Sequence, residues 1–166
     1  MGRRAALDRR LLLADGVPHE STGRELLGRF HRATLDLSAD DLADLHAPDA
    51  VYEFPLLSPS RPERYEGREA IRDGFREAWE AAPVRVDAIE GVVVYETREP
   101  EVIVAEHTAR ATVTTTGEPF VLPVLLVLRH AGGLIAHVRD YADALRGARA
   151  LGRLPELVAR LEAPGA

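Results

Sequence analysis

The side chains of this chain that can do chemistry are carboxylates, imidazoles, phenols, guanidinium groups and a few hydroxyls. All 21 basic residues are arginine, and cysteine, lysine, asparagine and glutamine are absent from the 166 residues. Without thiols there is no disulfide, thiolate nucleophile or cysteine-ligated metal, and without lysine there is no Schiff base or P-loop lysine. An oxyanion must therefore be stabilised by backbone N–H groups, Tyr, Arg, His or a protonated carboxylic acid.

Asp140 and His107 are each expected on a strip of small apolar residues. Alternation along a predicted strand over Leu134–Tyr141 places Asp140 on the face that carries Ala136 and Val138. On a neighbouring strand, the face of His107 is otherwise alanine and isoleucine. Apolar burial can raise the pKa of a carboxylic acid by up to about 3–5 units, which permits proton exchange near neutral pH. Two simpler interpretations stay open: Asp140 could cap a helix or pair with an arginine, and His107 could be a hydrogen-bonded core residue.

Three helices and one strand are predicted for the first half of the chain. Ser21 and Thr22 followed by Glu25 have capping-box spacing, and apolar residues then recur at helical intervals. The predicted elements are a helix over Thr22–Leu37, a short helix capped by Ser38 that ends before Pro48, a strand over Ala50–Leu56, a Pro/Ser loop over Leu57–Glu63 and a helix over Gly67–Ala82.

The second half has the period of two that is typical of strands. The predicted strands are Val84–Thr97, Glu101–Thr115, Pro119–Arg129 and Leu134–Tyr141, followed by a helix from about Asp143 to Leu161 that breaks at Pro155. Short connections predict an antiparallel meander, so the fold class is α+β.

The strand Phe120–Leu128 is apolar at almost every position, which indicates that both of its faces are buried. Helices can cover only one face of a curved sheet. We therefore expect a homodimer through the open face of the sheet; the alternative is that the C-terminal helix covers it.

Composition and charge limit the remaining classes of partner. The 46% hydrophobic and 29% charged composition is that of an ordinary globular domain, and a net charge of −6 argues against nucleic-acid binding. The longest apolar run near the N-terminus, Leu11–Ala14, is too short for a secretory signal, and no later segment is long enough to span a membrane. No spacing of His, Asp or Glu resembles a metal site. We expect a soluble, cytoplasmic protein with no metal, cofactor or membrane partner.

The order of these elements, the YEGREAI segment from Tyr65 to Ile71 and the Arg139-Asp140-Tyr141 sequence together resemble a known family. This is the SnoaL-like polyketide-cyclase group of the nuclear transport factor 2-like (ketosteroid isomerase-like) superfamily. The resemblance implies a curved antiparallel sheet wrapped by N-terminal helices into a cone with an internal cavity. It implies an N-terminal arm over residues 1–20, a cone domain over residues 21–154, and a helix end and tail over residues 155–166.

Several catalytic positions of the superfamily are changed in this chain. Phe54 stands where the isomerase relatives have a basic aspartate before a proline, and Phe30 stands near their tyrosine oxyanion donor. His107 and Ala109 occupy the places of an arginine and an aspartate in the epoxide hydrolases. Steroid isomerisation and epoxide hydrolysis by those mechanisms are therefore not expected.

The acid/base that cyclases of this group carry on the last strand, directly before a tyrosine, matches Asp140. The resemblance thus implies a small cofactor-free enzyme of a biosynthetic pathway, acting on an apolar carbonyl compound by cyclisation, isomerisation or dehydration, with Asp140 as acid/base and His107 as its helper. Aromatic residues of the expected cavity are substrate-binding candidates or simply core: Phe30, Tyr52, Phe54, Tyr65, Phe75 and Trp79. The alternatives are a dimer that binds a small molecule without chemistry, and a structural dimer whose side chains fill the cavity.

Overall fold

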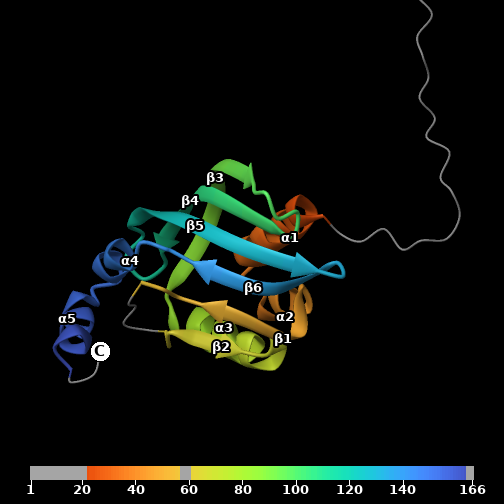
Figure 1. Ribbon diagram of the computed structural model, residues 1–166. Helices are drawn as coiled ribbons and strands as arrows, with labels where there is room; N and C mark the ends of the chain where they lie inside the picture. Colours follow the sequence, from red (N-terminus) through yellow and green to blue (C-terminus); the bar gives the residue numbers. More distant parts are fainter. Residues whose placement is uncertain (1–21, 57–60, 164–166) are drawn as a thin grey trace, which may run out of the picture.

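A computed structural model describes residues 22–56 and 61–163, so the expected N-terminal arm lies outside the described residues. Helices and an open, curved six-stranded sheet form the predicted α+β fold (Figure 1). The helices are α1 (Gly23–Leu35), α2 (Ala39–Asp44), α3 (Arg68–Ala81), α4 (Ala144–Ala150) and α5 (Leu154–Glu162). The strands are β1 (His46–Glu53), β2 (Arg64–Glu66), β3 (Val84–Glu96), β4 (Val102–Val113), β5 (Pro119–Ala131) and β6 (Leu134–Asp140).

The first two helices begin where their capping residues predict. The Glu25 N–H donates to the Thr22 hydroxyl at 3.2 Å, and the Thr22 N–H donates to the Glu25 carboxylate at 2.8 Å. The Ser38 hydroxyl accepts the Asp41 N–H at 3.2 Å at the start of α2. These side chains satisfy backbone donors that a helix start leaves free, so both predicted helix starts are confirmed.

The strands are ordered β2-β1-β6-β5-β4-β3 in the sheet. From β3 to β6 they form the predicted antiparallel meander, but β1 runs parallel to β6 and antiparallel to β2. The predicted antiparallel sheet therefore contains a parallel pair, made possible because a long stretch of chain, residues 54–133, lies between β1 and β6 as a crossover. The short strand β2 was not predicted, and β1 begins earlier than Ala50, at His46.

Irregular pairing between β3 and β4 bends the sheet around its helical side. The register shifts between Val86 and Ala88 and again between Glu90 and Val93. The second shift contains Gly91 at φ +62°, a backbone conformation that favours glycine. Helix α1 packs against β3, β4 and β5, while α3 packs against β1, β2 and α2. The hydrophobic core lies between these helices and the concave face.

The C-terminal helix is divided in two, as predicted, but the break lies at Gly152 (φ +68°) and not at Pro155. Pro155 lies in the first turn of α5, where its missing N–H removes no helical hydrogen bond. Helix α4 lies on the concave side, where Gly147 and the β5 residue Leu122 line one cavity. On the opposite face Val121 stays 42% exposed, so the alternative in which the C-terminal helix covers this face is wrong.

Across residues 22–56 and 61–163, no helix has both the length and the apolar character that crossing a membrane requires.

Candidate functional site

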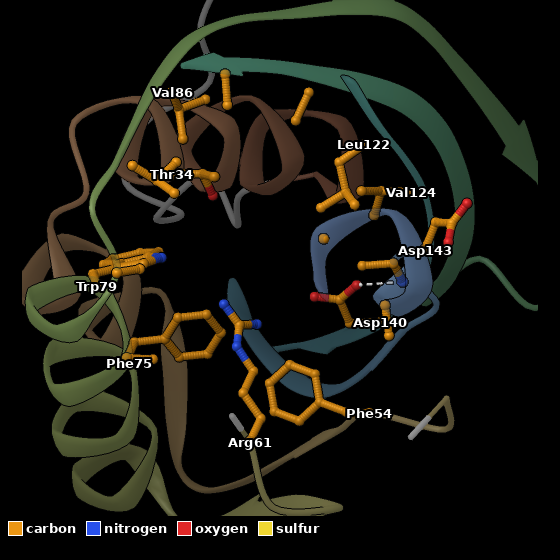
Figure 2. Close-up of a pocket in the computed structure, with 18 of the residues that line it drawn as sticks. Thr34, Phe54, Arg61, Phe75, Trp79, Val86, Leu122, Val124, Asp140 and Asp143 are labelled. Atoms are coloured by element: carbon orange, nitrogen blue, oxygen red, sulfur yellow. Dashed lines mark hydrogen bonds between the residues drawn. The ribbon is translucent and has the colours of Figure 1, made fainter. Parts of the chain in front are cut away.

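A cavity of about 240 Å³ lies between the concave face of the sheet and helices α1, α3 and α4 (Figure 2). Its aromatic lining residues are Phe30, Tyr52, Phe54, Phe75, Trp79 and Phe120. Its charged or titratable lining residues include Arg61, His107, Asp140, Asp143 and Arg153. A mostly apolar cavity with a few converging polar groups is the usual form of a small-molecule site.

Asp140 is the last residue of β6 and reaches the cavity because of strand alternation. Val138 and Asp140 are buried on the concave face, as predicted. His137 and Arg139 lie on the other face beside Glu53, whose Oε2 accepts the Arg139 Nε–H at 2.9 Å. The strand therefore carries a surface ion pair on one face and a buried acid on the other.

The Asp140 carboxyl is held by two hydrogen bonds. The Tyr52 hydroxyl donates to Oδ2 at 2.9 Å, and the Ala142 N–H donates to Oδ1 at 3.1 Å. Burial raises the pKa of Asp140, while the positive charge of Arg61 and the two hydrogen bonds oppose the rise. Asp143, and not Asp140, caps α4, and no arginine of the described chain forms an ion pair with Asp140. Neither simpler interpretation of this aspartate applies, and it is a buried acid facing a cavity.

Tyr52 has a different place from the simple ligand contact that was predicted. Its ring lines the cavity, but its hydroxyl donates its hydrogen bond to Asp140. Burial raises the pKa of Tyr52 well above its ordinary value, and the neighbouring Asp140 charge adds to this. The phenol therefore stays protonated and remains a hydrogen-bond donor to the acid. The pair depends on the parallel contact of β1 with β6, in which Tyr52 lies opposite Val138.

His107 and Asp140 line the same cavity but form no hydrogen bond with each other. His107 lies opposite Val124 on one side of β5, and Asp140 lies opposite Leu126 on the other side. Their backbones are thus two strand spacings apart across the sheet, about 10 Å, and are also offset by two residues along β5. The nearest ring to His107 is that of His31 on α1, with centroids 4.6 Å apart. The predicted role of His107 as a direct helper of Asp140 has no contact to support it here.

The His107 side chain is neutral, and one of its ring nitrogens has no hydrogen-bond partner among the described residues. Burial, followed by the nearby His31, lowers the pKa of His107 to about 4. Its Nδ1 is buried without a hydrogen-bond partner among the residues that the structure describes. Within the same ranges no group of three His, Asp or Glu side chains could hold a metal ion. A neutral imidazole at the cavity wall can still offer a donor or an acceptor to a bound molecule through its other ring nitrogen.

The predicted aromatic residues form one continuous wall, with one exception. Ring centroids of Tyr52 and Phe75 are 4.9 Å apart, and those of Phe75 and Trp79 are 5.0 Å apart. Phe54 lies 5.0 Å from Tyr52 in the same wall. Tyr65 is absent from the described lining: its ring packs against Phe54 and Phe75, which fits the core interpretation and not that of a substrate-binding residue.

Arg61 is the lining residue that sequence reasoning missed. Its guanidinium carbon lies 5.0 Å from the Phe54 ring centroid and 5.1 Å from that of Phe75. Its backbone carbonyl accepts a hydrogen bond from the Arg160 guanidinium of α5 at 2.8 Å. A Pro/Ser loop has no periodicity, so its sequence gave no direction for this side chain. The sequence offers the C-terminal helix only as a cover for the outer face, so the small residues of α4 that line the cavity, such as Ala144 and Gly147, are also missed.

Comparisons with known proteins agree on one family and fold. The sequence profile of the SnoaL-like domain matches residues 27–138. An uncharacterized PhzA/B-like protein of Pseudomonas aeruginosa is 32% identical over 129 residues, which cover 78% of this chain and 89% of that protein. The crystal structure of a candidate isomerase from Bacillus subtilis is 26% identical, covers 78% of this chain and 92% of its own, and superposes with a TM-score of 0.71. The crystal structure of a candidate polyketide cyclase from Pseudomonas putida is 17% identical over 79% of this chain and 98% of its own, with a TM-score of 0.64, and shares the fold.

Proposed function

Because the chain belongs to the SnoaL-like domain family, we propose that it is a cyclase- or isomerase-type enzyme of a biosynthetic pathway, which transfers protons on an apolar carbonyl compound. One observation carries the proposal: a buried carboxyl of raised pKa faces an apolar cavity and is oriented by a protonated tyrosine. The cyclase and isomerase descriptions of similar structures point to the same reaction class. The proposal keeps the cytoplasmic location and the cofactor-free chemistry expected from the sequence.

In this mechanism the Asp140 carboxylate removes a proton from a carbon next to the substrate carbonyl. The electron pair of the broken C–H bond forms an enolate, and apolar walls limit water around it. Three outcomes share this intermediate. The acid returns its proton to another carbon, or the enolate attacks a second carbonyl and the new alkoxide takes the proton, or a hydroxyl leaves as water. Each outcome regenerates the carboxylate. The neutral His107 is placed to donate a hydrogen bond to the carbonyl oxygen from another part of the wall.

The test begins with the small molecule that co-purifies with the protein, identified by mass spectrometry. Deuterium uptake from D₂O next to its carbonyl is then measured for the wild-type protein and for Asp140→Asn, which keeps the shape of the acid. We expect the variant to exchange about 10²–10⁴-fold more slowly, the usual contribution of a general acid or base.

The matched control is Asp73→Asn on the exposed side of α3, where the carboxylate pairs only with Arg76 among the described residues. We expect this control to exchange at the wild-type rate. Equal rates in the wild-type protein and in Asp140→Asn would exclude Asp140 as the acid/base.

A second candidate function is binding of a small molecule without chemistry. It is favoured by Phe30 and Phe54, which stand where the resemblance places catalytic polar groups and which line the cavity here. Binding of the co-purified compound with no deuterium uptake and no product would support this function. The third alternative, a cavity filled by the protein's own side chains, does not hold because the cavity is open.

We also propose that the protein is a homodimer through the outer, convex face of the sheet. Support comes from Val93, Tyr95 and Val121 on this face, which are large apolar side chains with 42–49% of their surface exposed.

A further inference from the structure

Arg61 brings a positive charge into a mostly apolar cavity and forms no ion pair with any residue that the structure describes. Figure 2 shows its side chain passing between Phe54 and Phe75, with the guanidinium directed to the open centre of the cavity. Two ring faces at about 5 Å attract the cation but accept few of its N–H groups. A guanidinium has five N–H donors in a planar fork, which matches the two oxygens of a carboxylate.

None of the carboxylates around the described cavity satisfies this guanidinium. Asp143 caps α4, where its Oδ1 accepts the backbone N–H of Arg146. Its Oδ2 also lies 3.0 Å from the Nε of the Arg146 side chain. Asp140 forms no ion pair with Arg61, and its oxygens already accept from Tyr52 and the Ala142 N–H. The backbone of Arg61 is nevertheless held by α5 through its carbonyl. Within residues 22–56 and 61–163, Arg61 is thus a cation whose backbone is held in place and whose side-chain N–H groups have no carboxylate partner.

We infer that the substrate is an organic acid, with its carboxylate bound by Arg61 and its apolar body against the aromatic wall. This inference rests on the proposed function, since it names the substrate class of the same cavity. A carboxylate at Arg61 places the rest of the molecule between the aromatic wall and Asp140, which faces the cavity from the other side (Figure 2). Arg61 is then a specificity-determining residue, and Asp140 remains the group that moves the proton.

Binding of such an acid also changes the electrostatic environment of Asp140. In the free protein the positive charge of Arg61 acts against the rise in the pKa of Asp140. A ligand carboxylate neutralises that charge, so the rise caused by burial is opposed less. His107 stays neutral, and Asp143 and Arg153 already have ion-pair partners in Arg146 and Glu156. The substrate's own anion therefore makes the acid easier to protonate.

The test compares two probes of the same shape by isothermal titration calorimetry of the full chain: 1-naphthylacetate, an anion, and 1-naphthylacetamide, which is neutral. We expect the wild-type protein to bind the anion at least about 10-fold more tightly, as charged hydrogen bonds in a dry site do. Arg61→Met should lose this preference while its affinity for the amide stays within about twofold. Arg61→Lys, which keeps the charge without the fork, should retain part of the preference.

The matched control is Arg64→Met, three residues further along, where the exposed side chain pairs with Glu66 and lies outside the described cavity lining. It should keep the wild-type preference for the anion. Three outcomes would each overturn the inference: equal affinity of the wild-type protein for both probes, equal loss of both in Arg61→Met, or no binding of either probe. The assay measures binding alone, so Asp140→Asn should retain the preference even if Asp140 proves not to be the acid/base. A failed deuterium-exchange test would therefore count against the proposed function and not against carboxylate binding by Arg61. A failed binding test would count against Arg61 and not against Asp140 as the acid/base.

Discussion

At the scale of single residues, the cavity contains three titratable groups whose neutral forms are favoured by burial. Burial favours the neutral form of Asp140, and the phenol of Tyr52 stays protonated beside it. His107 is neutral for the same reason, although an imidazole in water titrates near pH 6.5. A neutral imidazole can polarise a carbonyl by hydrogen bonding but cannot act as a cation. The proposed chemistry therefore depends on one acid that exchanges protons and on neutral donors around it.

The neutral state of His107 gives a testable pH dependence. Because its folded-state pKa is about 4, its imidazole nitrogens should show constant ¹⁵N chemical shifts from about pH 5.5 to 8. Its linked stability is complete above the unfolded pKa near 6.5, and it is lost as the pH falls towards 4. A His107→Phe variant identifies the resonance and should lose less stability over that acid range. A titration midpoint of His107 near 6.5 would contradict this account of the wall.

At the scale of elements, local signals in the sequence predicted most helices and strands, and nonlocal contacts explain what was missed. Thr22 with Glu25, and Ser38, set helix starts within a few residues. The pairing of β1 with β6 joins residues such as Tyr52 and Val138, 86 positions apart, and no local pattern contains it. The hydrogen bond from Tyr52 to Asp140 depends on that pairing, so the sequence could predict the acid but not its partner.

Alanine substitution at two helical glycines tests whether α3 holds the Tyr65 ring against the cavity wall. A Cβ at Gly74 would lie 2.3 Å from the Tyr65 ring, whereas a Cβ at Gly28 in α1 would meet nothing within 4 Å. Alanine is a better helix former than glycine by about 0.5–1 kcal/mol, so Gly28→Ala should raise the free energy of unfolding by about that amount. Gly74→Ala should lower it by about 1 kcal/mol or more, because overpacking costs about 1–3 kcal/mol.

Urea denaturation of both glycine variants gives the comparison directly. The Tyr65 ring also touches Phe54 and Phe75, so its displacement should disturb the cavity wall as well as stability. Equal stabilisation by the two substitutions would show that Tyr65 is not held against α3.

At the scale of the whole molecule, the described chain covers the concave face of the sheet and leaves a group of apolar side chains exposed on the convex face. On the convex side Tyr95 lies opposite Val104, and Val104 lies opposite Val127, so apolar side chains continue across three strands. Val121 extends this row along β5. Residues on β5 alternate between the cavity and this outer face, which explains why almost every position of the strand is apolar. In the proposed homodimer, a second copy of the chain supplies a matching surface by twofold symmetry.

Val121→Glu tests the proposed dimer interface. The matched control is Val158→Glu on α5, where the valine side chain is 50% exposed and lies outside the sheet. A twofold interface contains each residue twice, so Val121→Glu introduces two charges into an apolar contact, and their desolvation is costly. In sedimentation velocity we expect the wild-type protein and Val158→Glu to have twice the chain mass of 18.2 kDa, and Val121→Glu to be shifted to the monomer. Thermal unfolding of Val121→Glu should then become independent of protein concentration, since no association is linked to folding. A monomeric wild-type protein, or a Val121→Glu variant that remains dimeric, would mean that the convex face is exposed or that another surface joins the subunits.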